Sequence, residues 1–225
     1  MNRHVNSIAG RLSQRPPQRR SLEILDRVTE IVPPKKGADL QAAIDAIRSE
    51  FPTVTDFERE FPSLCFALAT GVGKTRLMGA FISYLYLAKG IKNFFVLSPN
   101  LTIYNKLITD LSEPNHPKYV FTGIGEFVHR RPRIITGDNY KDFRQLSFDQ
   151  SEVNISVFNI SKINAETRGE RKEMRNIIVA FVLAAVVFSC TPGPVYYAKS
   201  EHDSIKKSYN DKHVQNLYEA NSSLF

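Results

Sequence analysis

Seven neighbouring residues, Ala69 to Thr75 (ATGVGKT), have the types and spacing that hold a phosphate group. Gly71 and Gly73 permit backbone torsions that other residues avoid, so consecutive N–H groups can turn toward one anion. An apolar run precedes this loop and a helical pattern follows it, which places the loop at the positive end of a helix dipole. The expected ATP-binding residues are Thr70, Gly71, Val72, Gly73, Lys74 and Thr75, with Lys74 on the outer phosphates and the Thr75 hydroxyl on Mg²⁺.

This loop departs from the general phosphate-loop pattern G-x-x-x-x-G-K-[ST] at one position, because Leu68 stands where the first glycine is expected. The alternative is a glycine-rich turn from strand to helix that binds no ligand. The two correctly spaced glycines, followed at once by lysine and threonine, favour the nucleotide site.

Short apolar runs and helical patterns alternate around the loop, which is typical of an α/β fold with a parallel sheet. Residues 1–17 are expected to form an extended basic arm, followed by two helices that end before Pro33 and Pro52. Helices are predicted for residues 74–89 and 101–111, the second with Ile103, Leu107 and Leu111 on one face. Strands are predicted for residues 64–68, 94–97, 119–121, 134–135 and 155–160.

Length and composition indicate about one globular domain. The chain has 225 residues, of which 42% are hydrophobic and 24% charged, so a fibrous or fully disordered protein is excluded. Its two cysteines, Cys65 and Cys190, form neither a disulfide framework nor a zinc motif, which indicates a cytoplasmic protein. The formal net charge of +7 fits a polyanionic partner.

Two segments leave the location of the protein open. Residues 1–20 are rich in arginine and contain no acid, as a mitochondrial transit peptide would. The longest apolar run, residues 177–190, is shorter than the roughly 20 residues that cross a bilayer, so a membrane span is not expected. Membrane association through this tail remains the alternative.

Four stretches of the sequence carry a family resemblance: LCFALATGVGKTRLMGAFISYLY, FFVLSPNLTIYNKL, IITGDNY and FNISKINAE. Together they resemble the first motor domain of superfamily-two DEAD/DEAH helicases, and more closely the restriction subunit of type III restriction enzymes. The resemblance covers roughly residues 15–175 and implies an incomplete RecA-like P-loop NTPase domain. It divides the chain into a helical lead-in (1–60), a partial ATP-binding domain (61–175) and a divergent tail (176–225).

The resemblance also implies individual roles. Gln18 matches a glutamine that reads the adenine edge, and a simple cap of the helix that follows is the alternative. Asn100 and Thr102 match a loop on nucleic-acid phosphates, and Thr136 and Gly137 match a second one; ordinary turns are the alternative for both pairs. A solvated surface is likewise the alternative to phosphate contact for Lys162 and for the basic run at residues 129–133.

The family mechanism also needs an apolar strand that ends in Asp-Glu, and residues 165–225 do not show one. We therefore expect an ATP-binding N-terminal portion of a DNA helicase or translocase that hydrolyses ATP slowly. In a full member of the family, hydrolysis drives movement on double-stranded DNA and a methylase subunit reads the sequence. The alternatives are an inactive nucleotide- or DNA-binding fragment and a non-helicase P-loop NTPase such as a small kinase.

Overall fold

The computed structural model of the chain describes residues 2–34, 39–57, 62–139, 153–159 and 186–187. Three helices come first: α1 (Arg3–Arg11), α2 (Pro16–Ile31) and α3 (Leu40–Glu50). Helices and strands then alternate, which confirms the α/β class: β1 (Leu64–Cys65), α4 (Lys74–Lys89), β2 (Asn93–Ser98), α5 (Leu101–Ser112), α6 (Gly125–His129), β3 (Arg133–Thr136), β4 (Asn154–Asn159) and β5 (Val186–Val187).

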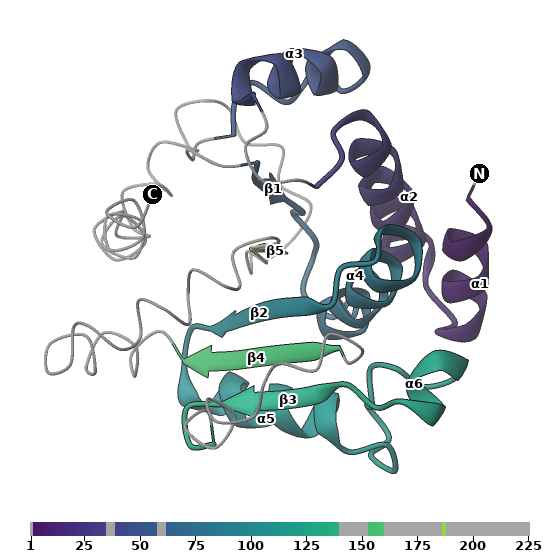
Figure 1. Ribbon diagram of the computed structural model, residues 1–225, viewed down its shortest axis with the longest axis vertical. Coiled ribbons are helices and arrows are strands. Elements are labelled where there is room, and N and C mark those ends of the chain that lie inside the picture. The colour runs from purple at the N-terminus through teal and green to yellow at the C-terminus, as the bar shows by residue number, and fades with distance from the viewer. Residues whose placement is uncertain (1, 35–38, 58–61, 140–152, 160–185, 188–225) are drawn as a thin grey trace, which may run out of the picture.

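The strands form a small parallel sheet in the order β2-β4-β3 (Figure 1). In this register Ser98 at the end of β2 pairs with Asn159 at the end of β4, so both strands finish at one edge. Every residue of β4 is buried, as expected for a central parallel strand. The short strand β1 pairs in parallel with β5 and forms a second, two-stranded sheet.

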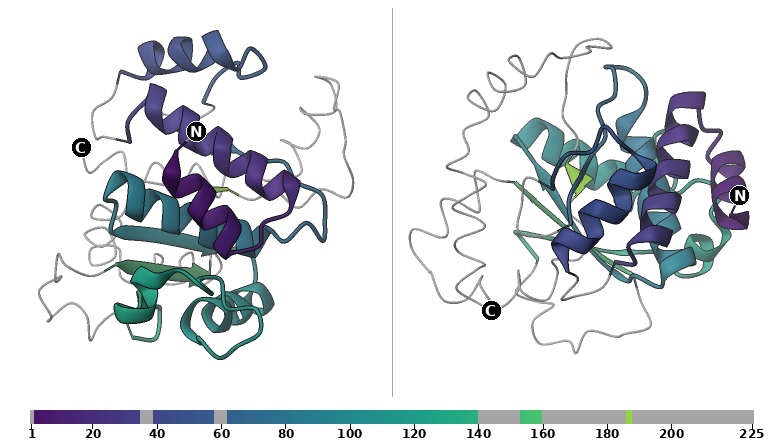
Figure 2. Two further views of the ribbon diagram at one scale, coloured as in Figure 1. Left: turned by 90° about the vertical axis from the view of Figure 1, so that its right-hand side faces the viewer. Right: turned by 90° about the horizontal axis from the view of Figure 1, so that it is seen from above.

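Helix α4 is the centre of the hydrophobic core. Its residues 77–85 are all buried, because the helix is apolar on nearly every side. Helices α1 and α2 pack against α4 and share its core with apolar side chains of β2 and β4 (Figures 1 and 2). The N-terminal helices and the sheet therefore enclose the helix that follows the glycine-rich loop.

The expected extended arm at residues 1–17 is wrong, because residues 3–11 form α1. The Asn2 side chain caps this helix by accepting a hydrogen bond from the His4 N–H at 3.0 Å. Val5 and Ile8 recur at helical spacing and are 0% and 1% exposed. Only Val5, Ile8 and Ala9 of this helix are buried, and polar or basic residues surround this narrow apolar stripe, which concealed it in the sequence.

Residues 119–121 form turns and not the expected strand. Their side chains are buried, but the Val120 N–H donates to the Asp110 carbonyl and the Tyr119 N–H to the His116 carbonyl, so the segment forms no ladder with the sheet. A short apolar run fits a buried loop as well as a buried strand. Strand β1 is also shorter than the apolar run at residues 64–68.

Helix α5 buries Leu107 and Leu111 of the expected face, but not Ile103. Tyr104 is buried and Ile103 is 40% exposed, so the core-facing residues are spaced three and four apart from Tyr104 onward. Of the apolar run at residues 177–190, only β5 lies within the described residues. Among the helices of the described ranges, none has both the length and the apolar character needed to cross a membrane.

Candidate functional site

Residues 66–73 connect β1 to α4 and contain the glycine-rich loop. Gly71 and Gly73 adopt left-handed backbone torsions, with φ of 81° and 92°, which side chains of L residues rarely allow. Gly73 is the N-cap of α4, and Lys74 is the first helical residue. The first backbone N–H groups of this 16-residue helix thus have no partner within the helix and can serve an anion.

Charge and exposure around this loop suit an anion. The Lys74 Nζ donates to the Ala69 carbonyl at 3.2 Å, so the ammonium group is folded back over the loop. Thr70 and Gly71 are exposed, and Lys74 and Thr75 are half-buried. The sequence from residue 62 to residue 109 contains no Asp or Glu but carries Lys74, Arg76, Lys89, Lys92 and Lys106.

The structure brings Gln18 directly against the loop, from the first turn of α2. Its Nε2 donates to the Gly73 carbonyl at 2.9 Å, and its Oε1 accepts from the Arg15 N–H at 2.8 Å. Gln18 therefore caps α2, as the alternative for this residue expected, and contacts the loop as well. Arg15 was missed in the sequence: its Nη1 donates to the Gly71 carbonyl at 3.0 Å.

The other predicted site residues lie at the carboxyl edge of the three-stranded sheet. Asn100 follows β2 and caps α5, accepting a hydrogen bond from the Ile103 N–H at 2.9 Å. Thr102 is exposed in the first turn of the same helix. Thr136 ends β3, and Gly137 follows it. Because the strands are parallel, both pairs of residues come to one edge.

Asn139 shapes the turn after β3, and the sequence reasoning did not single it out. Its Oδ1 accepts from the Thr136 N–H at 2.6 Å, its Nδ2 donates to the Ile134 carbonyl at 3.3 Å, and its own N–H donates to the Thr136 carbonyl at 3.3 Å. An asparagine in a T-G-D-N stretch is a recognisable turn signal. Turn formation alone accounts for these contacts, and the nucleic-acid role of Thr136 and Gly137 stays a prediction.

The basic run has mixed exposure. His129 is exposed at the end of α6, and Arg130 and Arg131 are exposed between α6 and β3. Pro132 is buried, and Arg133 is half-buried at the start of β3. Lys162 and the region searched for an Asp-Glu pair, residues 165–225, lie outside the described residues except for β5.

Together these features define an α/β protein with a glycine-rich loop between a strand and a helix. Comparison with known families gives a match over residues 24–184 to the family described as "Type III restriction enzyme, res subunit". This match covers most of the chain, and the chain belongs to that family. The matched range contains the glycine-rich loop, begins after Arg15 and Gln18, and extends into the tail that was expected to start at residue 176.

A curated relative agrees with the family. The chain is 27% identical over 131 residues to the "Probable type III restriction-modification enzyme HindVIP Res subunit" of Haemophilus influenzae. The aligned part is 57% of this chain and 23% of the relative, so the chain spans about a quarter of that protein's length. No solved structure matches the chain.

Proposed function

We propose that the loop at residues 69–75 binds the triphosphate of ATP, and that the chain is an ATP-binding portion of a DNA helicase or translocase of the type III restriction kind. The observation that carries this proposal is the pair of left-handed glycines at the start of α4, directly followed by Lys74. Family membership adds weight, because it makes a helicase-type motor more plausible than an unrelated kinase.

The residues present fit a magnesium–nucleotide complex. Helix N-terminal amides and one ammonium group are the donors that triphosphates prefer, and the absence of acids from the sequence around the loop removes a source of repulsion. Thr75, the second residue of α4, is the candidate for the hydroxyl that contacts Mg²⁺. Bound Mg²⁺ would neutralise part of the phosphate charge.

The proposal is tested by titrating the chain with ATP and Mg²⁺ in a calorimeter. We expect saturable binding that Lys74→Ala weakens by about tenfold or more, because the variant loses a charge-assisted contact. Lys106→Ala is the control, because Lys106 is exposed on α5 and its replacement removes the same charge. Absence of binding by the unmodified chain, or equal affinity in Lys74→Ala, would refute the ATP site.

DNA and a methylase subunit are the partners that we propose, with the cytoplasm as location. The support is the relative, whose name describes a restriction-modification enzyme. A second candidate is a nucleotide- or DNA-binding fragment without turnover, which the lack of an Asp-Glu pair in the sequence of residues 165–225 favours. DNA-stimulated ATP hydrolysis by the 225-residue chain would exclude that candidate.

A further inference from the structure

Two side chains at the start of α2 hold two carbonyl groups of the glycine-rich loop. Arg15 Nη1 donates to the Gly71 carbonyl at 3.0 Å, and Gln18 Nε2 donates to the Gly73 carbonyl at 2.9 Å. We call this pair of contacts the loop latch. The two donors lie 56 and 55 residues before the carbonyls they hold, so the latch is a tertiary contact between α2 and the loop.

The latch contributes to the direction of amide groups that the proposed site needs. The Gly73 carbonyl also accepts a hydrogen bond from the Leu77 N–H at 3.1 Å, so at this position the Gln18 contact adds to a helix bond. The described peptide bonds are all trans, and a trans peptide points its C=O and N–H in opposite directions. The peptide with the Gly73 carbonyl carries the N–H of Lys74, and the peptide with the Gly71 carbonyl carries the N–H of Val72. Holding each carbonyl on the α2 side therefore turns the matching N–H to the other side, away from α2.

The start of α2 is built to present both donors. Arg15 is the N-cap of α2 and Gln18 is the third helical residue, with Pro16 and Pro17 fixing the backbone between them. The Arg15 N–H donates to Gln18 Oε1 at 2.8 Å, which orients the glutamine amide so that Nε2 faces Gly73. The fit is close, because a Cβ at Gly73 would come within 2.6 Å of that nitrogen.

Burial limits what else Gln18 can do. Its side chain is 2% exposed, and both of its polar atoms bond to the backbone. Each of these atoms keeps one further hydrogen-bonding capacity, but a base-reading amide must offer a donor and an acceptor to the ligand, and a side chain buried to this degree presents neither at the surface. We propose that Gln18, with Arg15, is a positioning residue that orients the phosphate-binding amides of the loop, so that its contribution to nucleotide binding is independent of the base. This inference rests on the proposed ATP site.

The test compares three probes: Mg-ATP, Mg-GTP and Mg-tripolyphosphate, which has no base. Binding to Gln18→Met and to Arg15→Ala is measured at a temperature where circular dichroism shows every variant folded. We expect each variant to weaken all three probes by the same factor, about tenfold, since one orienting hydrogen bond is lost. A role in stability alone would leave the affinities of the folded protein unchanged.

Arg20→Ala is the matched control, because Arg20 is exposed on the same helix and pairs with Glu23 at 3.7 Å. If Gln18→Met weakens binding of Mg-ATP but not of Mg-GTP or Mg-tripolyphosphate, the glutamine reads adenine and the inference is overturned. Unchanged affinity in both variants would also overturn it. Failure of the ATP site itself looks different: the unmodified chain would bind no probe, or Lys74→Ala would bind as the unmodified chain does.

Discussion

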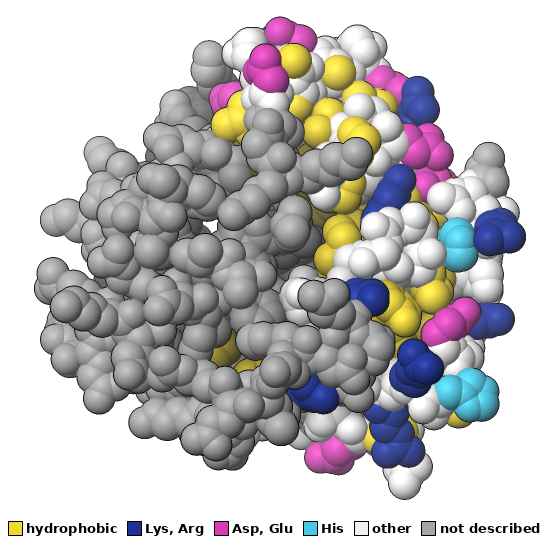
Figure 3. Space-filling view, viewed as in Figure 1, with side chains coloured by type: hydrophobic (Ala, Val, Ile, Leu, Met, Phe, Trp, Pro, Cys, Tyr) yellow, Lys and Arg dark blue, Asp and Glu magenta, His cyan; other side chains and the backbone are white. Residues whose placement is uncertain are grey.

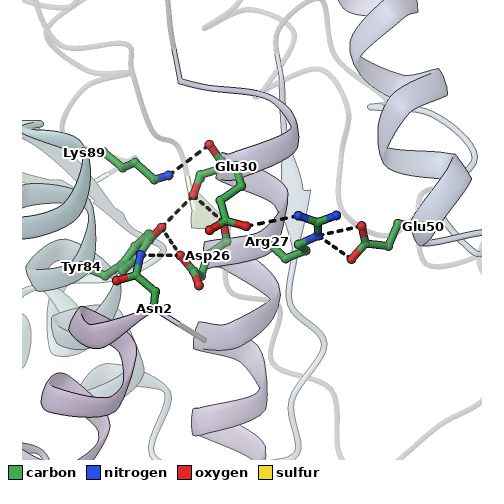
Figure 4. A network of polar contacts seen from close by, with 8 residues as sticks. Asn2, Asp26, Arg27, Glu30, Glu50, Tyr84 and Lys89 are labelled. Atoms are coloured by element: carbon green, nitrogen blue, oxygen red, sulfur yellow. Dashed lines mark hydrogen bonds and ion pairs between the residues drawn. The ribbon is translucent and has the colours of Figure 1, made fainter.

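Tyr84 is a buried tyrosine whose hydroxyl group joins α4 to α2, and the carboxylate that it contacts also binds the start of α1. It is 0% exposed on α4, donates to Asp26 Oδ1 on α2 at 2.7 Å and lies 3.1 Å from the Thr29 hydroxyl (Figure 4). Asn2, the cap of α1, donates to the same Asp26 oxygen at 2.9 Å. Removing a donor from a buried carboxylate costs free energy, so Tyr84 couples α1 and α2 to α4 through Asp26.

Replacing Tyr84 by phenylalanine tests this coupling. Tyr84→Phe keeps the ring but removes a donor from a buried carboxylate, so we expect the free energy of unfolding to fall by about 1–3 kcal/mol at neutral pH. Urea denaturation followed by circular dichroism measures the change. Wild-type stability in this variant would show that Asp26 does not depend on the tyrosine hydroxyl.

The effect of Tyr84→Phe on the free energy of unfolding should also depend on pH. Burial raises the pKa of Tyr84 above its ordinary value of 10.0, so in alkali the folded chain keeps a proton that the unfolded chain releases. The stabilisation from this group is complete below about pH 10 and declines as the pH rises further. The stability difference between the wild type and Tyr84→Phe should therefore shrink above about pH 10, and the urea midpoints of both proteins at rising pH measure it.

At the residue scale, the sequence identified the loop better than it identified the groups that support it. The spacing of Gly71, Gly73 and Lys74 is local, so it could be recognised without a fold. Arg15 and Gln18 act on carbonyls more than fifty residues away, and that proximity arises only when α2 packs against α4. A residue type alone does not tell whether an amide faces a base or a backbone carbonyl.

Among the helices and strands, α4 packs closely against a neighbouring turn at one glycine, Gly79. A Cβ at Gly79 would lie 2.6 Å from the Val120 carbonyl oxygen and 2.7 Å from the Val120 Cβ. This close approach lets the buried turn at residues 119–121 pack directly on the helix. The turn at residues 119–121, which the sequence predicted to be a strand, can therefore pack on α4 because Gly79 has no side chain.

Gly79→Ala separates helix propensity from packing. Alanine is better than glycine within a helix by about 1 kcal/mol, but here the methyl group meets backbone and cannot be accommodated without movement. We expect a net loss of about 1–3 kcal/mol in the free energy of unfolding, measured by urea denaturation.

Gly10→Ala is the control for this prediction. Gly10 lies in α1, and a Cβ there would meet nothing within 4 Å, so the variant should be as stable as the wild type or more stable. If Gly79→Ala gains stability as Gly10→Ala does, then the turn is not packed tightly on α4.

Element prediction worked where the length of an apolar segment, a helical spacing or a proline marked the element. The sequence predicted α4 at residues 74–89 and the ends of α2 and α3 before Pro33 and Pro52, and the structure confirms them. It failed at α1, whose apolar stripe is narrow, and at residues 119–121, whose burial comes from contact with α4. Parallel pairing of β2, β4 and β3 also joins residues far apart in sequence, so strand order could not be read from local patterns.

On the scale of the whole molecule, charge is unevenly distributed. On the face shown in Figure 3, acidic side chains gather over α3, whereas lysine and arginine side chains gather over the region of α6. Arg27 on α2 binds both carboxylate oxygens of Glu50 on α3 at 2.7 Å, which lowers the pKa of Glu50.

This distribution gives the DNA proposal a measurable form. If the exposed Arg130 and Arg131 contact phosphates, each releases about one counterion on binding, and the affinity for duplex DNA falls with rising salt. We expect Arg130→Ala/Arg131→Ala to reduce the magnitude of the log Kd against log salt slope by about 2, measured by fluorescence anisotropy. We expect both charges to contribute, because the two guanidinium groups lie within one exposed run between α6 and β3.

A charge-matched control decides whether location or net charge matters. Arg3→Ala/Arg48→Ala removes the same two charges from exposed positions on α1 and α3, the latter within 3.3 Å of Asp45. If the basic run tracks phosphates, this control keeps nearly the whole slope, because counterion release counts only groups that contact the DNA. Equal slopes for the two double variants would instead assign the basic run to a solvated surface.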